Sequence, residues 1–94
     1  MPIFSFPDDP WWNEAIEAVE FSVAVGEYQG RVTCARRQLT GLGAGRADAE
    51  CLEFVYAHRA WFEKAAEAKI EARDLSPDGN IELTGRDLRR VFPR

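Results

Sequence analysis

Residues 47–73 read ADAECLEFVYAHRAWFEKAAEAKIEAR, with apolar side chains recurring at helical spacing. We therefore predict one unbroken helix of about seven turns, ~40 Å long at ~1.5 Å of rise per residue. On a helical wheel one broad arc collects Cys51, Phe54, Val55, His58, Trp61, Phe62, Ala65 and Ala66. Such a helix is longer than a domain of this size is wide, so the rest of the chain has to be arranged around it.

The segment before this helix alternates between apolar and polar or small residues, which is typical of half-buried β-strands. The first alternation places apolar residues at Val19, Phe21, Val23 and Val25. A second alternation runs through residues 28–34, so we predict a β-hairpin that turns at Gly26-Glu27, with Gly30 as a candidate bulge. We also expect a short strand at residues 3–6 and a loop at residues 8–13.

Shorter elements flank the long helix on both sides. Residues 36–42 predict a short helix that ends in the glycine run of residues 41–45. This run has the spacing G-x-G-x-G rather than the G-x-G-x-x-G of dinucleotide-binding loops, which argues against a nucleotide site. Downstream we predict a turn at residues 76–79, a strand at 80–83 and a last helix, which Thr84 and Asp87 begin as a capping box.

Together these elements predict a single domain, residues 1–94, of the α+β class. We expect an antiparallel sheet of three to four strands. One long helix packs across one face of this sheet, and the short helices lie around it.

The composition is that of an ordinary globular protein, with 46% hydrophobic residues, 30% charged residues and a net charge of −4. No apolar run approaches the ~20 residues of a membrane span, and the first residues lack the pattern of a signal peptide. We therefore expect a cytoplasmic protein without membrane contact. Cys34 and Cys51 are too few and too far apart for a disulfide framework or a zinc knuckle, so we expect two buried free thiols.

Several motifs occur in a characteristic order along the chain. They are Ile3-Phe4 to Phe6-Pro7, Ala18-Val19-Glu20-Phe21, Val32-Thr33-Cys34, His58-Arg59 with Phe62-Glu63 and Ala65-Ala66, and Asp78-Gly79-Asn80-Ile81-Glu82-Leu83-Thr84. In this order and spacing the chain resembles a family of small bacterial proteins known as domain of unknown function 1488. Val55 and the segment 36–46 depart from the family pattern. The resemblance implies an α+β fold and assigns no catalytic residues.

His58 is the only histidine, so any acid–base or nucleophile–histidine scheme would have to use it. It falls near the centre of the apolar arc, which favours a half-buried histidine that is hydrogen-bonded to the sheet. Cys51 lies two turns back on the same helix, about 10 Å of rise away, too far for a direct hydrogen bond. We therefore expect no enzyme, no catalytic or metal-binding residues and no cofactor.

Surplus large apolar groups favour a protein-interaction surface instead. A second, thinner apolar flank of the long helix and the pair Trp11-Trp12 are the candidates, since tryptophan is favoured at interfaces. Arg59 is either the partner of Glu63 in an i,i+4 ion pair or an anchor for an anionic partner. The candidate interaction surface is Trp11, Trp12, Leu52, Tyr56, Arg59 and Ile70. From it we expect a non-enzymatic interaction or accessory protein that forms a homodimer, with an unknown protein partner.

The charge is unevenly distributed along the chain. The first 35 residues carry six acidic side chains and one basic one, whereas the last eleven residues carry four arginines and one aspartate. These arginines, Arg86, Arg89, Arg90 and Arg94, are the candidate contacts to an anion or nucleic acid. The negative net charge argues against nucleic-acid binding in general, so a nucleic-acid-binding accessory protein is kept as the alternative.

Overall fold

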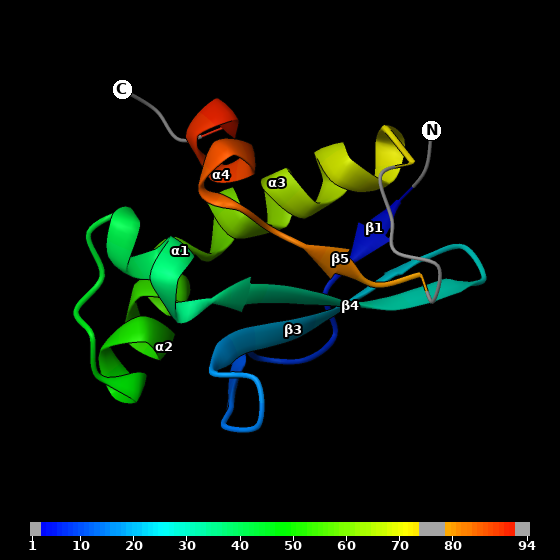
Figure 1. Ribbon diagram of the computed structural model, residues 1–94. Helices are drawn as coiled ribbons and strands as arrows, with labels where there is room; N and C mark the ends of the chain where they lie inside the picture. Colours follow the sequence, from blue (N-terminus) through cyan, green and yellow to red (C-terminus); the bar gives the residue numbers. More distant parts are fainter. Residues whose placement is uncertain (1–2, 74–78, 92–94) are drawn as a thin grey trace.

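The structure is a computed structural model that describes residues 3–73 and 79–91 of the chain. Figure 1 shows the arrangement of its helices and strands. In chain order they are β1 (Phe4–Ser5), β2 (Trp11–Asn13), β3 (Ala18–Val25), β4 (Tyr28–Ala35), α1 (Arg36–Gly41), α2 (Asp48–Ala57), α3 (Arg59–Glu71), β5 (Ile81–Glu82) and α4 (Gly85–Val91). The α+β class is confirmed, and so are the short first strand, the short helix after the hairpin, the strand near residue 81 and the last helix.

The centre of the sheet is the predicted β3–β4 hairpin. Its register runs without interruption from Ala18 opposite Ala35 to Val25 opposite Tyr28, so the bulge predicted at Gly30 is absent from this ladder. β5 pairs with β4 in parallel, with Ile81 opposite Val32. The expectation of a purely antiparallel sheet is therefore wrong at this one pair. The physical reason is that three helices carry the chain back across the sheet between β4 and β5, and such a crossover connection suits parallel strands.

The outer edge of β3 is paired by two short strands instead of one. β1 places Ser5 opposite Ala24, and β2 places Trp11 opposite Glu20, so the loop predicted at residues 8–13 is partly a strand. Between these two pairs, residues 6–10 of the edge lie opposite only residues 21–23 of β3. The edge therefore has two extra residues, which form a bulge. Pro7 and Pro10 lie in this bulge, where their missing N–H groups cost no ladder hydrogen bond.

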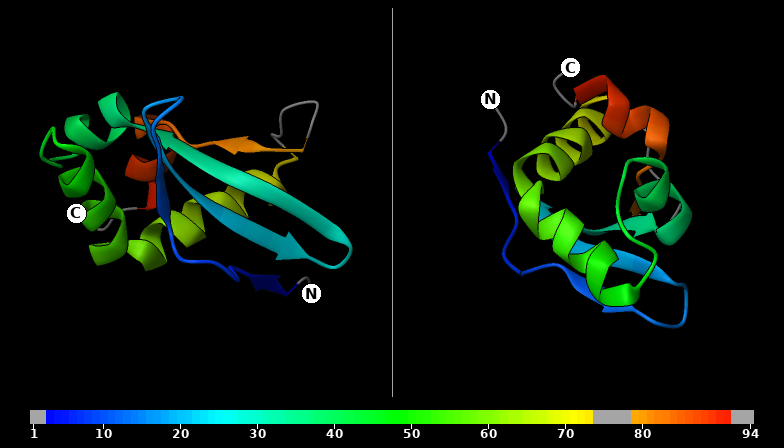
Figure 2. Two further views of the ribbon diagram at one scale, coloured as in Figure 1. Left: turned by 90° about the horizontal axis from the view of Figure 1, so that it is seen from below. Right: turned by 90° about the vertical axis from the view of Figure 1, so that its left-hand side faces the viewer.

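The predicted long helix is broken at His58, so the expectation of one unbroken helix is wrong. α2 and α3 meet there, and His58 has φ −119° and ψ 26°, outside helical values. α2 packs against β2 and β3, whereas α3 packs against β5 and α4. The molecule measures 36 × 32 × 22 Å, so a straight helix of the predicted length would overhang it. Figure 2 shows the change of direction between α2 and α3, which lets both helices bury their apolar sides.

The core lies between the sheet and the helices. It takes Val19, Phe21 and Val23 from β3 and Val32 and Cys34 from β4. The helices contribute Leu39, Cys51, Val55, Phe62, Ala65, Ala66 and Leu88, and Ile81 and Leu83 come from the β5 region. The predicted apolar arc therefore faces the core, with Phe54, His58 and Trp61 at its half-buried margin.

Within residues 3–73 and 79–91, no helix covers the residues that point the other way from the centre of β3 and β4. We call this surface the open face; its members are Glu20, Ser22, Ala24, Gln29, Arg31, Thr33 and Ala35. In Figure 1, α3 and α4 lie above the hairpin, and α1 and α2 lie at the end where β3 begins and β4 ends. No helix in the described residues is long and apolar enough to cross a membrane.

The last helix begins as the sequence predicts. The Thr84 amide donates to Asp87 Oδ2 at 2.9 Å, and the Asp87 amide donates to Thr84 Oγ1 at 3.3 Å, which completes the capping box. Lys69 Nζ of α3 also binds Asp87 Oδ2, at 3.0 Å. This network joins α4 to α3. The turn predicted at residues 76–79 falls mostly on 74–78, outside the described residues.

Candidate functional site

Glu20 is the one charged residue buried among the described residues, with 3% of its surface exposed. Its Oε1 accepts a hydrogen bond from Asn13 Nδ2 at 2.8 Å, and its Oε2 accepts one from Thr33 Oγ1 at 2.8 Å. The Arg31 guanidinium lies 3.7 Å away. A buried carboxylate is costly unless it is paired and hydrogen-bonded, and here the two strands beside β3, which are β2 and β4, supply its partners. Glu20 therefore fixes the relative positions of β2, β3 and β4 on the open face.

The two neighbouring tryptophans point to opposite faces of the sheet. Trp11 is half-buried on the open face, with the Arg31 guanidinium 5.7 Å above its ring. Trp12 packs against the core and is covered by the Arg36 guanidinium at 4.9 Å, while its Nε1 donates to Glu14 at 2.8 Å. They do not form one exposed aromatic surface.

Arg59 binds the N-terminal segment of its own chain. Its guanidinium donates to Glu63 Oε2 at 2.8 Å, which confirms the predicted i,i+4 pair, and also to Asp9 Oδ1 at 2.8 Å. Two further bonds reach the carbonyl oxygens of Phe6 and Asp8, at 3.2 and 3.0 Å. The hydrogen bond to Asp9, opposed by partial desolvation and helped by the bond to Glu63, raises the pKa of Arg59. Arg59 holds the bulged edge of the sheet against α3.

The break in the helix distributes the remaining candidate interaction residues. Leu52 and Ile70 are half-buried and pack against the core, whereas Tyr56 has 47% of its surface exposed. Leu52 and Tyr56 belong to α2, and Ile70 belongs to α3. The second apolar flank is thus divided between two helices of different direction.

His58 lies half-buried at the junction of α2 and α3. Its Nδ1 is 2.9 Å from the Phe54 carbonyl oxygen, and its ring stacks on Trp61 with centroids 4.8 Å apart. The predicted half-burial is confirmed, but this hydrogen bond goes to the preceding turn of helix and not to the sheet. His58 closes the end of α2.

The arginines of the last helix lie on its outer side. Arg86, Arg89 and Arg90 are exposed, and their side chains form no ion pair within the described residues. Arg94 lies outside those residues. Gln38 Oε1 of α1 accepts from the Gly85 amide at 2.6 Å, so α4 begins directly beside α1.

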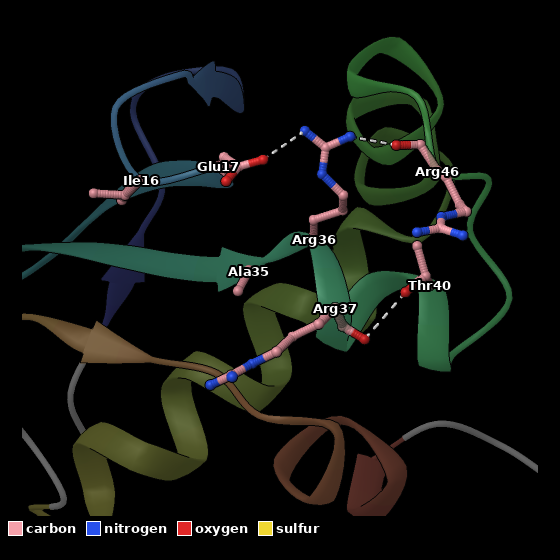
Figure 3. A pocket seen from close by; sticks show the side chains of 7 residues that line it. All are labelled: Ile16, Glu17, Ala35, Arg36, Arg37, Thr40 and Arg46. Carbon is pink, nitrogen blue, oxygen red and sulfur yellow. Dashed lines mark hydrogen bonds and ion pairs between the residues drawn. The ribbon is translucent and has the colours of Figure 1, made fainter.

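A hollow lies at the end of the open face, beside α1. It has a volume of about 630 Å³ and is lined by Ile16, Glu17, Ala35, Arg36, Arg37, Thr40 and Arg46. A second hollow, of about 360 Å³, shares Ile16, Ala35 and Arg37 and continues past Thr33 to Asn80, Ile81 and Glu82. We call the two together the α1 groove. Figure 3 shows Arg37 extending toward β5, while Arg46 lies beside Thr40.

Arg36 holds one wall of the α1 groove. Its guanidinium donates to Asp48 Oδ1 at 2.7 Å, to Glu17 Oε1 at 3.3 Å and to the Arg46 carbonyl oxygen. Burial opposes its charge, but the bond to Asp48 and the fields of the nearby carboxylates outweigh burial and raise its pKa. Three segments that are separate in sequence meet at this one side chain.

Sequence reasoning missed both Glu20 and the α1 groove. A glutamate at an outward position of a strand is ordinarily solvated, and only the strand register shows that Thr33 and Trp11 lie opposite it. The adjacent Arg36-Arg37 pair was a signal for the groove, but its other wall comes from residues around 16 and 46.

The sheet with helices on one face defines a small α+β protein, and its two free thiols are buried. The described part of the chain holds no group of three or more side chains that could ligate a metal ion. The chain belongs to the family described as "Protein of unknown function (DUF1488)", whose model matches residues 4–83. This confirms the resemblance seen in the sequence. Among curated proteins there is no match.

One solved structure shares the fold over most of the chain. It is the crystal structure of a protein of unknown function from the DUF1488 family of Shewanella loihica PV-4. The two chains are 19% identical, with a TM-score of 0.77, over 86% of this chain and 91% of that chain. At this identity the likeness establishes the fold.

Proposed function

We propose that this protein is a non-enzymatic, cytoplasmic interaction protein that works as a homodimer. The observation that carries the proposal is the open face, where a hairpin of two eight-residue strands has the described helices on its other side only. Ser22 and Ala24 are small and half-buried there, so a second sheet can approach closely. Two-fold pairing would bring this face of one copy against the same face of the other.

The chemistry of the possible nucleophiles supports a non-enzymatic role. Cys34 and Cys51 are both free and buried. Burial, with a smaller effect of Cys51 and two carboxylates, raises the pKa of Cys34 to about 12, so its thiol stays protonated. His58 is bound to the Phe54 carbonyl at the helix junction.

Sedimentation equilibrium over the micromolar range tests the homodimer. We expect twice the chain mass of 10.6 kDa. Ala24→Arg places a long charged side chain on the open face and should give the single mass, whereas Ala72→Arg, an exposed matched control after α3, should leave the dimer intact. A wild-type chain that sediments with the single mass would overturn the proposal. Urea unfolding of Ala24→Arg separates loss of the dimer from loss of the fold.

A second candidate function is nucleic-acid binding by the exposed arginines of α4. The observation in its favour is that Arg86, Arg89 and Arg90 share one short helix and α1 lies beside it. It predicts affinity for a single-stranded or double-stranded oligonucleotide that falls steeply with salt, and weaker binding by Arg89→Glu. Absence of binding at low salt would remove this candidate.

A further inference from the structure

We infer that the α1 groove binds an extended peptide segment of a partner protein, one that presents a carboxylate beside an apolar side chain. This inference rests on the proposed interaction function and names the chemistry of the partner. It concerns a surface at the end of the open face, where Ala35 lies, whereas the proposed dimer contact is centred on Ser22 and Ala24.

The size and shape of the groove suit a peptide. Its larger part, of about 630 Å³, lies within the range of ~300–1,000 Å³ that is usual for ligand pockets. Its two hollows share Ile16, Ala35 and Arg37, so they lie side by side, from the Arg46 loop across the end of β4 to β5. Two adjacent hollows across strand ends accommodate an extended chain better than a compact molecule.

The wall of the groove is organised before any ligand arrives. Arg36 joins Glu17, Asp48 and the Arg46 carbonyl, and its own amide donates to the Glu17 carbonyl at 3.1 Å. Its guanidinium also covers Trp12, which packs on the core. Binding therefore orders little additional protein, which favours affinity.

Two guanidinium groups in the groove are available to a carboxylate. Within the described residues, Arg37 and Arg46 donate no side-chain hydrogen bond and form no ion pair. Both side chains line the groove, in different parts of it (Figure 3). A guanidinium matches a carboxylate with two parallel hydrogen bonds, so acidic side chains are the natural ligands.

The groove also has an apolar part, and each of its two hollows is lined by one glutamate. Ile16 has 50% of its surface exposed, and Ala35 forms the surface between the two hollows. Glu17 lines the larger part and Glu82 the smaller part. A nucleic acid, with a phosphate at every nucleotide, would place negative charge beside these carboxylates. A peptide with a single acidic side chain avoids this repulsion and can rest an apolar side chain on Ile16.

An NMR titration of the isotope-labelled full chain tests the inference. The probe is the acetylated and amidated pentapeptide Ala-Leu-Glu-Leu-Ala, and the matched probe has Gln in place of Glu. We expect saturable shifts of the amides of Ile16, Ala35 and Arg37 with the Glu peptide and much weaker ones with the Gln peptide. Arg37→Glu should weaken binding by about tenfold or more, because Arg37 lines both parts of the groove, and Arg46→Glu should weaken it less.

Arg73→Glu is the control, because Arg73 is exposed beyond the far end of α3 and the change in charge is the same. It should alter affinity by less than about twofold. Arg37→Gln serves as the second variant should Arg37→Glu fail to give a folded spectrum. Inorganic phosphate and a single-stranded oligothymidylate complete the series.

Four outcomes would overturn the inference. They are no shift at these amides, equal binding of the Glu and Gln peptides, equal affinity of inorganic phosphate at the same residues, and tighter binding of the oligothymidylate there. A dimer by sedimentation that binds no peptide would leave the proposed function standing and remove this inference alone. A monomer that binds the Glu peptide would remove the proposed homodimer and leave this inference standing.

Discussion

At the scale of single residues, Glu20 has the most demanding environment in the molecule. Its carboxylate is buried, and Asn13, Thr33 and Arg31 meet at its two oxygens. We predict that Glu20→Ala lowers the free energy of unfolding by about 1–3 kcal/mol, because it leaves the amide and the hydroxyl without their acceptor. Urea denaturation measures this, with Glu27→Ala in the exposed hairpin turn as control. Equal stability of the two variants would contradict the account of Glu20.

The two thiols provide a second prediction at this scale. Because burial raises the pKa of Cys34 to about 12, and burial is also the main cause that raises the pKa of Cys51, neither forms thiolate near neutral pH. We expect negligible reaction with a disulfide reagent at mildly alkaline pH in the native state. Both thiols should react in denaturant. Rapid labelling of either thiol in the native protein would show that the site is open.

At the scale of secondary-structure elements, the bulged edge of the sheet depends on Arg59. Its guanidinium reaches Asp9 and the carbonyl oxygens of Phe6 and Asp8 at once, which a lysine ammonium cannot reproduce. We predict that Arg59→Lys speeds hydrogen exchange of the amides of β1 and of Ala24 and Val25 by about tenfold. Arg73→Lys is the matched control. Unchanged exchange in Arg59→Lys would mean that β1 is held by other contacts.

The start of α4 gives stability that depends on pH. Burial alone would raise the pKa of Asp87, but the Thr84 amide, Lys69 and the Thr84 hydroxyl outweigh it and hold the pKa below its usual value of 3.8. A lowered pKa means that the stabilisation is present above that usual value and is lost as pH falls through the lowered one. We therefore expect Asp87→Asn to be less stable than wild type by about 1 kcal/mol near neutral pH.

Urea unfolding at a series of pH values checks the prediction for Asp87. The difference between wild type and Asp87→Asn should shrink steadily below about pH 4. A difference in stability that stays constant across the acidic range would contradict the conclusion that the charged Asp87 carboxylate provides this stabilisation.

The elements also show what could be predicted from the sequence and what could not. Period-two alternation identified β3 and β4 and their turn, because one face of each strand is buried. The break at His58 had no local signal, since its surroundings are good helix formers and the cause is the packing of α2 and α3 on different partners. The parallel pairing of β5 likewise depends on the path of the chain between β4 and β5.

The candidate site was harder to predict than the fold, for a similar reason. Arg59 was recognised as important, but its partners in residues 6–9 are some fifty positions away. The α1 groove combines the β2–β3 turn, α1 and the Arg46 loop. Such a meeting point is a property of the folded chain, and composition or periodicity cannot indicate it.

At the scale of the whole molecule, the sheet divides the protein into two unlike sides. One side is a packed core beneath four helices, and the other is the open face (Figure 2). The centre of the open face consists of small and polar residues. Trp11 lies near one edge of this face, and the α1 groove lies at one end of it. We propose that this face contacts the same face of a second copy. The account therefore rests on whether a second copy occupies the open face.

An isotope-filtered nuclear Overhauser experiment on a mixture of labelled and unlabelled chains tests this claim most directly. If two copies meet at the open face, the methyl group of Ala24 will show contacts to the unlabelled copy, and Ala24→Arg will abolish all contacts between the copies. Contacts that instead map to α2 or α3, or a mixture with no contacts between copies at concentrations far above the micromolar range, would contradict the account.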